Sequence, residues 1–295
     1  LRSRNGKRSG SRGIIAHYNR AWRKAPLMKR IRMTATIIIA AAAAIALIVA
    51  VIHIVDWRMR VKAAQADQEA LALAYDFDPG NIISDGQFFN GSAMSEAQVQ
   101  SFLNEQGGAL ASRTFDTQDE SGESLCADYT GAKKESAAAI IAKSGEACRV
   151  SQKVLLTMLQ KEQHLVTATQ PTDFQLKAAM GLSCPDDANC DPAYAGFFRQ
   201  VYGAAKRYRY YLEHESRYGY HAGQLNYIQY HPDAACGGTD VYIENKATAL
   251  LYIYTPYQPN RAALEAVTGE GDSCSSYGNR NFAFIYTNWF GSPRN

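Results

Sequence analysis

Residues 151–166 read SQKVLLTMLQKEQHLV, and the spacing of their apolar side chains predicts an amphipathic helix capped by Ser151. On a helical wheel of about 100° per residue, one apolar stripe contains Leu155, Met158, Leu159, Leu165 and Val166. Glu162 falls in the middle of this stripe, whereas Lys161 falls on the polar face. Because burying an unpaired charge is costly, a carboxylate at this position indicates a special role.

Two interpretations of Glu162 follow from the wheel. A carboxyl group held against apolar side chains has a raised pKa, which a general acid working near neutral pH requires. The alternative is that Glu162 lies at the rim of the stripe, paired with an Arg or a Tyr, and takes no part in chemistry.

The segments around this helix predict further helices and one small β-hairpin. Residues 134–148 also have helical periodicity, and we expect the two helices to pack as a hairpin. Ser95 and Gln98 form a capping box for a short helix that Gly107-Gly108 ends. Further helices are expected over residues 196–215, 245–257 and 279–290, and a β-hairpin over residues 224–245 about Gly237-Gly238. The fold class is therefore mainly α (α+β).

Towards the N-terminus, residues 34–55 read TATIIIAAAAAIALIVAVIHIV and carry no charge. At about 1.5 Å per residue, this length spans the roughly 30 Å hydrocarbon core of a bilayer. The preceding flank holds Arg20, Arg23, Lys24, Lys29, Arg30 and Arg32 without an acid, so we expect a cytoplasmic N-terminus. A cleaved signal peptide ending at Ala64-Gln65-Ala66 and a buried core helix are the alternatives.

This segment divides the chain into four expected parts. They are a basic cytoplasmic tail over residues 1–33, a transmembrane helix over 34–55, a helical stalk over 56–78 and an exported domain over 79–295. Residues 1–60 hold 13 basic and 1 acidic side chains, and residues 61–295 hold 18 and 27, giving net charges of +12 and −9. The basic tail is interpreted as an orientation signal beside an anionic leaflet, and no nucleic-acid partner is expected.

The six cysteines all lie in the expected exported domain, which favours disulfides formed in an oxidising compartment. Closeness along the chain favours the pairs Cys126–Cys148, Cys184–Cys190 and Cys236–Cys274 among the 15 possible pairings. No Cys-x-x-Cys or paired Cys/His spacing is present, so no metal site is expected. No cofactor is expected either.

Several long segments carry a resemblance to known families. The stretch VLLTMLQKEQ, residues 154–163, resembles the helix that ends in the catalytic glutamate of the lysozyme-like superfamily, especially the lytic transglycosylases and goose-type lysozymes. Residues 79–291 resemble a group of actinobacterial exported domains, some of which carry a hemagglutinin-type name. The matched segments are NIISDGQFF, MSEAQVQSFL, VLLTMLQKEQHLVT, AMGLSCPDDANCD, NYIQYHPDAACG, YIYTPYQPN, GDSCSSYGNRNF and NWFG.

The resemblance implies a lysozyme-like helical domain that acts on peptidoglycan glycan strands, with Glu162 as general acid. Two residues depart from the transglycosylase pattern, because Gln163 stands where Ser is usual and residues 179–182 only partly match the Gly-Leu-Met-Gln loop. Tyr254 takes the place of the superfamily's active-site tyrosine. A hydrolase needs a second carboxylate, for which the candidates are Asp173, Asp186, Asp187 and Glu213.

Tyrosines that lie in or beside loops are the expected sugar-binding residues, because Tyr presents an apolar face together with a hydroxyl group. These residues are Tyr227, Tyr254 and Tyr257.

The sequence therefore predicts a membrane-anchored enzyme that cleaves peptidoglycan, of lytic transglycosylase or muramidase type, with residues 34–55 in the lipid bilayer. The chief alternative is a non-catalytic module of the same fold that binds the cell wall or serves in adhesion. A third possibility is a structural partner of a secretion or division assembly.

Overall fold

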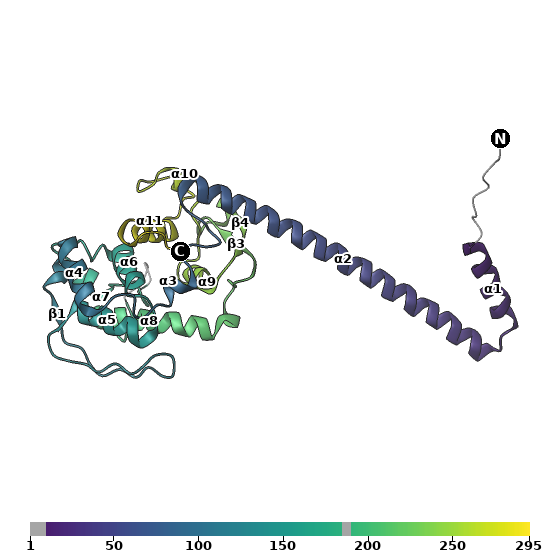
Figure 1. Cartoon of the computed structure of the whole chain (residues 1–295), viewed down its shortest axis with the longest axis horizontal. Coiled ribbons are helices and arrows are strands. Elements are labelled where there is room, and N and C mark those ends of the chain that lie inside the picture. The colour runs from purple at the N-terminus through teal and green to yellow at the C-terminus, as the bar shows by residue number, and fades with distance from the viewer. Residues whose placement is uncertain (1–9, 185–189) are drawn as a thin grey trace. The chain divides into compact units, whose positions relative to one another are not determined.

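The computed structural model describes residues 10–184 and 190–295, which form two compact units, Leu1–Arg60 and Val61–Asn295. The elements follow the chain as labelled in Figure 1. The structure is mainly helical with two small antiparallel hairpins and one long apolar helix near the N-terminus, so the predicted fold class is confirmed.

The first unit consists of α1 (Gly10–Lys24) and the N-terminal part of α2 (Leu27–Tyr75). Between the two helices, the Arg30 guanidinium donates hydrogen bonds to the carbonyl oxygens of Arg23 (2.6 Å) and Ala25 (2.8 Å). Those bonds satisfy carbonyl groups at the C-terminal end of α1, which have no partner within the helix. Among the described residues, α2 is the one helix long and apolar enough to cross a membrane, judged by length and composition.

The second unit begins within the last turns of α2. Ala64 and Gln68 are buried there, and the side-chain amide of Gln68 accepts from Tyr242 N (2.8 Å) and donates to Tyr242 O (3.2 Å). The end of the predicted stalk is therefore packed against the domain that follows it.

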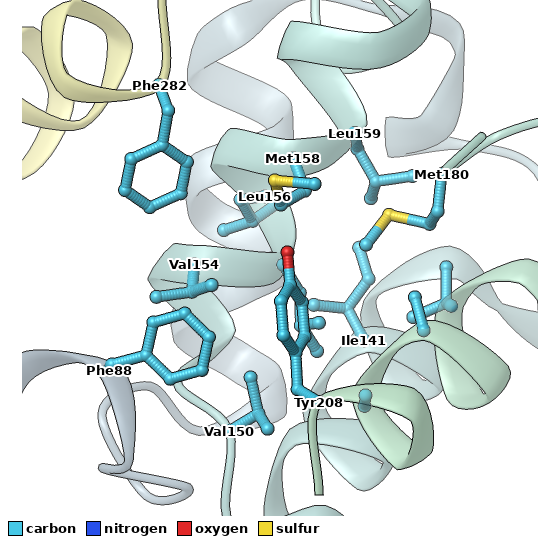
Figure 2. Packing of buried hydrophobic residues seen from close by; sticks show 14 of the residues in the cluster. Phe88, Ile141, Val150, Val154, Leu156, Met158, Leu159, Met180, Tyr208 and Phe282 are labelled. Atoms are coloured by element: carbon cyan, nitrogen blue, oxygen red, sulfur yellow. The ribbon is translucent and has the colours of Figure 1, made fainter. Parts of the chain in front are cut away.

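Five helices surround the core of the second unit, with α5 packed against α4, α6 and α8, and α6 packed against α11. Their bounds are Glu96–Gln106 (α4), Ala137–Cys148 (α5), Gln152–Gln163 (α6), Phe197–Glu213 (α8) and Gly278–Phe290 (α11). Apolar side chains of α5, α6 and α8 meet in this core, where Tyr208 lies among Phe88, Val150 and Met158 (Figure 2). Burial of these side chains is the main source of stability of such a unit.

The predicted helix ends are mostly confirmed. Ser95 and Gln98 form the capping box of α4, and Gly107 ends this helix in the left-handed conformation with φ of 70°. Ser151 is the N-cap residue of α6, but its hydroxyl group caps nothing and has no hydrogen-bond partner. The expectation that Ser151 caps through its side chain is therefore wrong.

The predicted hairpin is formed by β3 (Gln224–Gln229) and β4 (Gly238–Ile243), which pair antiparallel from Gln224–Ile243 to Gln229–Gly238. A shorter pair, β1 (Thr114–Phe115) with β2 (Glu135–Ser136), was not predicted, since two residues give no periodicity.

The predicted helix over 245–257 is α9 (Lys246–Tyr254). Short helices that the sequence analysis did not identify are α3 (Asp85–Phe88), α7 (Asp173–Lys177), α10 (Arg261–Glu265) and the 3₁₀ turns Ala109–Ala111, Glu215–Arg217 and Ala234–Cys236.

Three disulfides join Cys126 to Cys148, Cys184 to Cys190 and Cys236 to Cys274. These are the pairings that closeness along the chain favours. The first ties the long connection between β1 and β2 to the end of α5, and the third ties the β3–β4 connection to the segment before α11.

Candidate functional site

The site is built on the last turn of α6. His164 follows this helix in the left-handed conformation with φ of 57°, and its N–H bonds to Gln160 O at 2.9 Å. Glu162 lies just before this end, and its side chain retains 23% of its exposure. The carboxylate is therefore accessible, whereas the preceding residues Val154 to Leu159 are buried.

The nearest charged group to Glu162 is its neighbour in sequence. Lys161 Nζ lies 2.7 Å from Glu162 Oε1 and also donates to Thr255 Oγ1 at 3.0 Å. The Lys161 side chain is only 7% exposed, so its predicted place on the wet face is wrong. The expectation of purely apolar surroundings for Glu162 is wrong too, because an ion-pair partner is present and that partner is a lysine.

A loop closes over the other side of the carboxyl group. Gly181 has φ of 68°, and a Cβ added there would lie 3.2 Å from Glu162 Oε2. Glycine meets both demands of this position, since it adopts positive φ without strain and lets the backbone approach a side chain closely. The loop belongs to the segment 179–182, which only partly matches the transglycosylase pattern in sequence.

Gln200 of α8 holds this loop in place. Its side-chain oxygen accepts from Met180 N (3.0 Å) and Leu182 N (3.1 Å), and its amide nitrogen donates to Leu182 O and Tyr194 O, both at 2.8 Å. Gln200 is fully buried, so all four bonds are shielded from water. Sequence reasoning missed this residue, because only the fold brings residues 180 and 200 together.

Tyr254, the last residue of α9, holds the same loop from a second direction. Its hydroxyl donates to Met180 O, and its ring centroid lies 6.0 Å from Lys161 Nζ. Burial raises the pKa of the Tyr254 hydroxyl well above its usual value, and the nearby Glu162 charge adds to this effect. Tyr254 is therefore a neutral hydrogen-bond donor at physiological pH, and the structure brings it beside Glu162, Lys161 and the 181 loop.

Behind Tyr254, the ring of Tyr208 stacks on it with centroids 5.2 Å apart. The Tyr208 hydroxyl is buried, points towards α6 and has no hydrogen-bond partner (Figure 2). A buried hydroxyl without a partner costs free energy, so this group destabilises the fold slightly.

The other two predicted sugar-binding tyrosines lie on different elements. Tyr257 belongs to the segment after α9, whose carbonyl groups at Thr255 and Tyr257 accept from Asn279 Nδ2 at 2.9 Å each. Through Thr255 this segment contacts Lys161. Tyr227 lies within β3 and is 58% exposed, so it is on a strand rather than in a loop.

The structure does not favour one of the described candidates for the second carboxylate over another. Asp173 is exposed at the N-terminus of α7, where a negative charge is stabilised by the helix dipole. Glu213 ends α8 and lies 3.8 Å from Arg209. Asp186 and Asp187 lie outside the described residues. In the described part of the chain, no group of three His, Cys, Asp or Glu side chains is placed to hold a metal ion.

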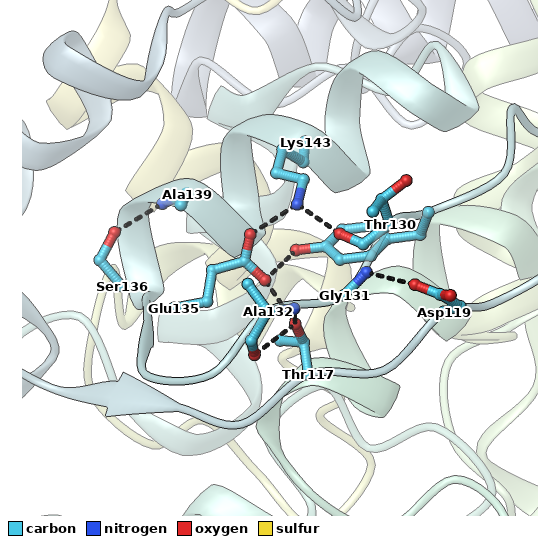
Figure 3. Close-up of polar contacts among 10 residues, drawn as sticks. Thr117, Asp119, Thr130, Gly131, Ala132, Glu135, Ser136, Ala139 and Lys143 are labelled. Atoms are coloured by element: carbon cyan, nitrogen blue, oxygen red, sulfur yellow. Dashed lines mark hydrogen bonds and ion pairs between the residues drawn. The ribbon is translucent and has the colours of Figure 1, made fainter.

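A buried carboxylate, Glu135, belongs to a different cluster that sequence reasoning missed (Figure 3). Its carboxylate accepts from Thr117 (2.6 Å), Tyr129 (2.8 Å) and Lys143 (2.6 Å). Burial alone would raise the pKa of Glu135, but these three donors outweigh burial and lower it. Both carboxylate oxygens accept hydrogen bonds within the fold, so the cluster fastens the β1–β2 connection to α5.

Together these elements define a class: a mainly helical, disulfide-bonded domain after a long apolar helix, with an accessible acid at a helix end under a glycine loop. The family described as "LasA, N-terminal domain" matches residues 81–295, so the chain belongs to that family. No curated protein and no solved structure gives a significant match. The description of this family refers to LasA. The resemblance to hemagglutinin-type and lysozyme-like domains stays a prediction.

Proposed function

We propose that this protein is a membrane-anchored enzyme that cleaves the glycan strands of peptidoglycan, with Glu162 as its single general acid and base. The observation that carries the proposal is the meeting of Glu162, Gly181 and Tyr254, three elements that the lysozyme-like resemblance expects at one site. Membership of the LasA N-terminal family supports action on the cell wall.

The pair of Lys161 and Glu162 suggests how the acid obtains its proton. Lys161 Nζ and Glu162 Oε1 lie 2.7 Å apart, and the two side chains are 7% and 23% exposed. A glycan strand bound over Glu162 excludes water from this ion pair. Transfer of one proton from Lys161 Nζ to Glu162 then leaves a neutral amine and a carboxylic acid, which protonates the glycosidic oxygen.

After bond cleavage, the same carboxylate serves as base. In a transglycosylase it takes the proton of the muramic C6 hydroxyl group, whose oxygen closes the anhydro ring without water. In a muramidase, water attacks with the help of a second carboxylate. We favour the first course, because it requires only Glu162 and no second carboxylate.

The surface of α2 supports the membrane anchor. Its isoleucines between residues 37 and 54 are about half to two-thirds exposed, with no protein cover along the most apolar part of the helix. In water such a continuous apolar surface is unfavourable, whereas a bilayer accommodates it. The three disulfides support the placement of the second unit outside the cytoplasm.

A second candidate is a cell-wall-binding or adhesion module of the same fold without activity. The ion pair itself favours this candidate, because structural ion pairs between a lysine and a partly buried carboxylate occur without any catalytic role.

One assay separates the two candidates. The full chain in detergent micelles is incubated with purified peptidoglycan, and soluble fragments are collected and analysed by mass. The enzyme releases fragments that end in anhydro-muramic acid, and Glu162→Gln releases none while unfolding at the same temperature. Co-sedimentation of both proteins with the wall, without release by either, supports the binding module and contradicts the enzyme.

A further inference from the structure

A cavity of about 590 Å³ lies along one face of α8, formed by residues other than those of the Glu162 site. Along the helix it is lined by Arg199, Gly203, Lys206, Arg207 and Tyr210, whose spacing places them on one side of α8. Gly203 lies between the charged side chains, and a Cβ there would lie 2.8 Å from Leu182 Cδ2, so the missing side chain makes room for Leu182.

The second wall is the segment around residues 118–127, which is fastened to α8 at three points. Arg199 donates to Gln118 Oε1 (3.3 Å), Lys206 to Ser121 O (2.8 Å) and Tyr202 to Ala127 O (3.1 Å). The Cys126–Cys148 disulfide holds the same segment to α5. The cavity is therefore held open by the fold on both sides.

The net charge of the residues that line the cavity is opposite in sign to the net charge of the whole unit. Its lining holds Arg199, Lys206 and Arg207 against Glu120 and Glu123, a net charge of +1, in a unit whose net charge is −9. Lys206 pairs with Glu123 at 3.3 Å, and Arg199 donates to Pro192 O at 3.2 Å as well as to Gln118 Oε1. Guanidinium groups bind carboxylates through two parallel hydrogen bonds.

Aromatic rings stand beside these guanidinium groups. Tyr194, Tyr210 and Tyr218 line the cavity and are each half-buried. The Arg207 guanidinium lies 5.7 Å from the Tyr194 ring centroid and donates to the Tyr194 hydroxyl at 3.4 Å, which fixes the orientation of the cation. Flat rings with hydroxyl edges suit the apolar face and the hydroxyl groups of a sugar.

From this combination we infer that the α8 cavity is a binding site for a carboxylate-bearing sugar. The guanidinium groups of Arg199 and Arg207 hold the carboxylate, and the tyrosine rings pack against the pyranose. Glu120 accepts from sugar hydroxyl groups. This site does not depend on the proposed function of Glu162.

The test compares glucuronic acid with glucose, which differ only in a carboxylate or a hydroxymethyl group on C5. Binding to the full chain in micelles is titrated by saturation-transfer NMR, which detects weak ligands. We expect glucuronate to bind at least about tenfold more tightly than glucose, since a charge-assisted contact contributes about 1.5–3 kcal/mol. Arg207→Gln and Arg199→Gln should each remove most of that preference.

Arg261→Gln is the matched control, because Arg261 is an exposed arginine of α10 that pairs with Glu265 outside the cavity. It should leave the preference for glucuronate unchanged, as should Glu162→Gln. Equal binding of the two sugars, binding of neither, or equal losses in Arg261→Gln and the cavity variants would overturn the inference. Unchanged melting temperatures exclude misfolding, and Arg199→Gln serves if Arg207→Gln unfolds.

Discussion

The ammonium nitrogen of Lys161 lies 2.7 Å from the carboxylate of Glu162, the next residue in the chain. Neighbouring residues on a helix point about 100° apart, so the contact requires both long side chains to bend towards each other. Thr255 accepts from the same ammonium group and holds it in place. The end of α6 therefore holds an acid, Glu162, in an ion pair with its proposed proton donor, Lys161.

This arrangement predicts the effect of Lys161→Met. The variant keeps the carboxyl group but loses the proposed internal proton source, so activity near neutral pH should fall by about tenfold or more. The measurement is the pH profile of fragment release. A profile that matches the wild type would rule out the lysine as proton donor.

Replacing Gly181 tests the loop over the carboxyl group. Gly181→Ala places a Cβ 3.2 Å from Glu162 Oε2 and forces alanine into positive φ. We expect a loss of about 1–2 kcal/mol in the free energy of unfolding and a loss of fragment release larger than this destabilisation explains. Gly107→Ala is the control, since Gly107 has a similar φ of 70° with open space around its Cβ position. Equal losses of activity in both variants would contradict the proposed role of the loop.

Two tyrosine variants test the hydrogen bond that Tyr254 donates to the 179–182 loop. Tyr254→Phe removes the donor to Met180 O and should cost about 1–2 kcal/mol of stability, together with activity. Tyr208→Phe removes a hydroxyl group that has no partner, so stability should be unchanged or slightly higher. Chemical unfolding of the two variants measures both effects. The proposed contact fails if Tyr208→Phe is the more destabilised of the two.

Much of the fold was predictable from local sequence. Apolar periodicity predicts α6, the capping box predicts α4, and closeness along the chain predicts the disulfides, whereas the role of Glu162 stays a prediction. Each of these signals involves residues near one another in sequence. The wheel nevertheless places Lys161 in water, because it takes no account of Thr255 and the start of α11, which cover that face of the helix.

The parts that were missed depend on contacts between distant segments. Gln200 holds the 180–182 loop from a position some twenty residues later. The Glu135 cluster brings Thr117 and Tyr129 of the β1–β2 connection together with Lys143 of α5. No periodicity marks such residues, because their burial depends on segments that lie far apart in the chain.

The Glu135 cluster predicts an acid-sensitive contribution to stability. The folded-state pKa of Glu135 is lowered from the usual value of 4.5, so its contribution is full above that value and is lost as the pH falls through the folded pKa. Glu135→Gln should cost about 2 kcal/mol at neutral pH, and the gap to the wild type should narrow below about pH 4. Urea unfolding at pH 7 and pH 3.5 measures this gap. A constant gap would contradict the lowered pKa.

The most direct test of the account is the rate at which the full chain releases soluble fragments from purified peptidoglycan, measured for the wild type and Glu162→Gln. Gln keeps the size of the side chain and an oxygen that accepts from Lys161, and the melting temperatures of both proteins check that each is folded. We predict that the wild type releases fragments and that Glu162→Gln is slower by about 10²–10⁴-fold, the usual contribution of a general acid and base. Equal rates, or no release by a correctly folded wild type, would contradict the central role of Glu162.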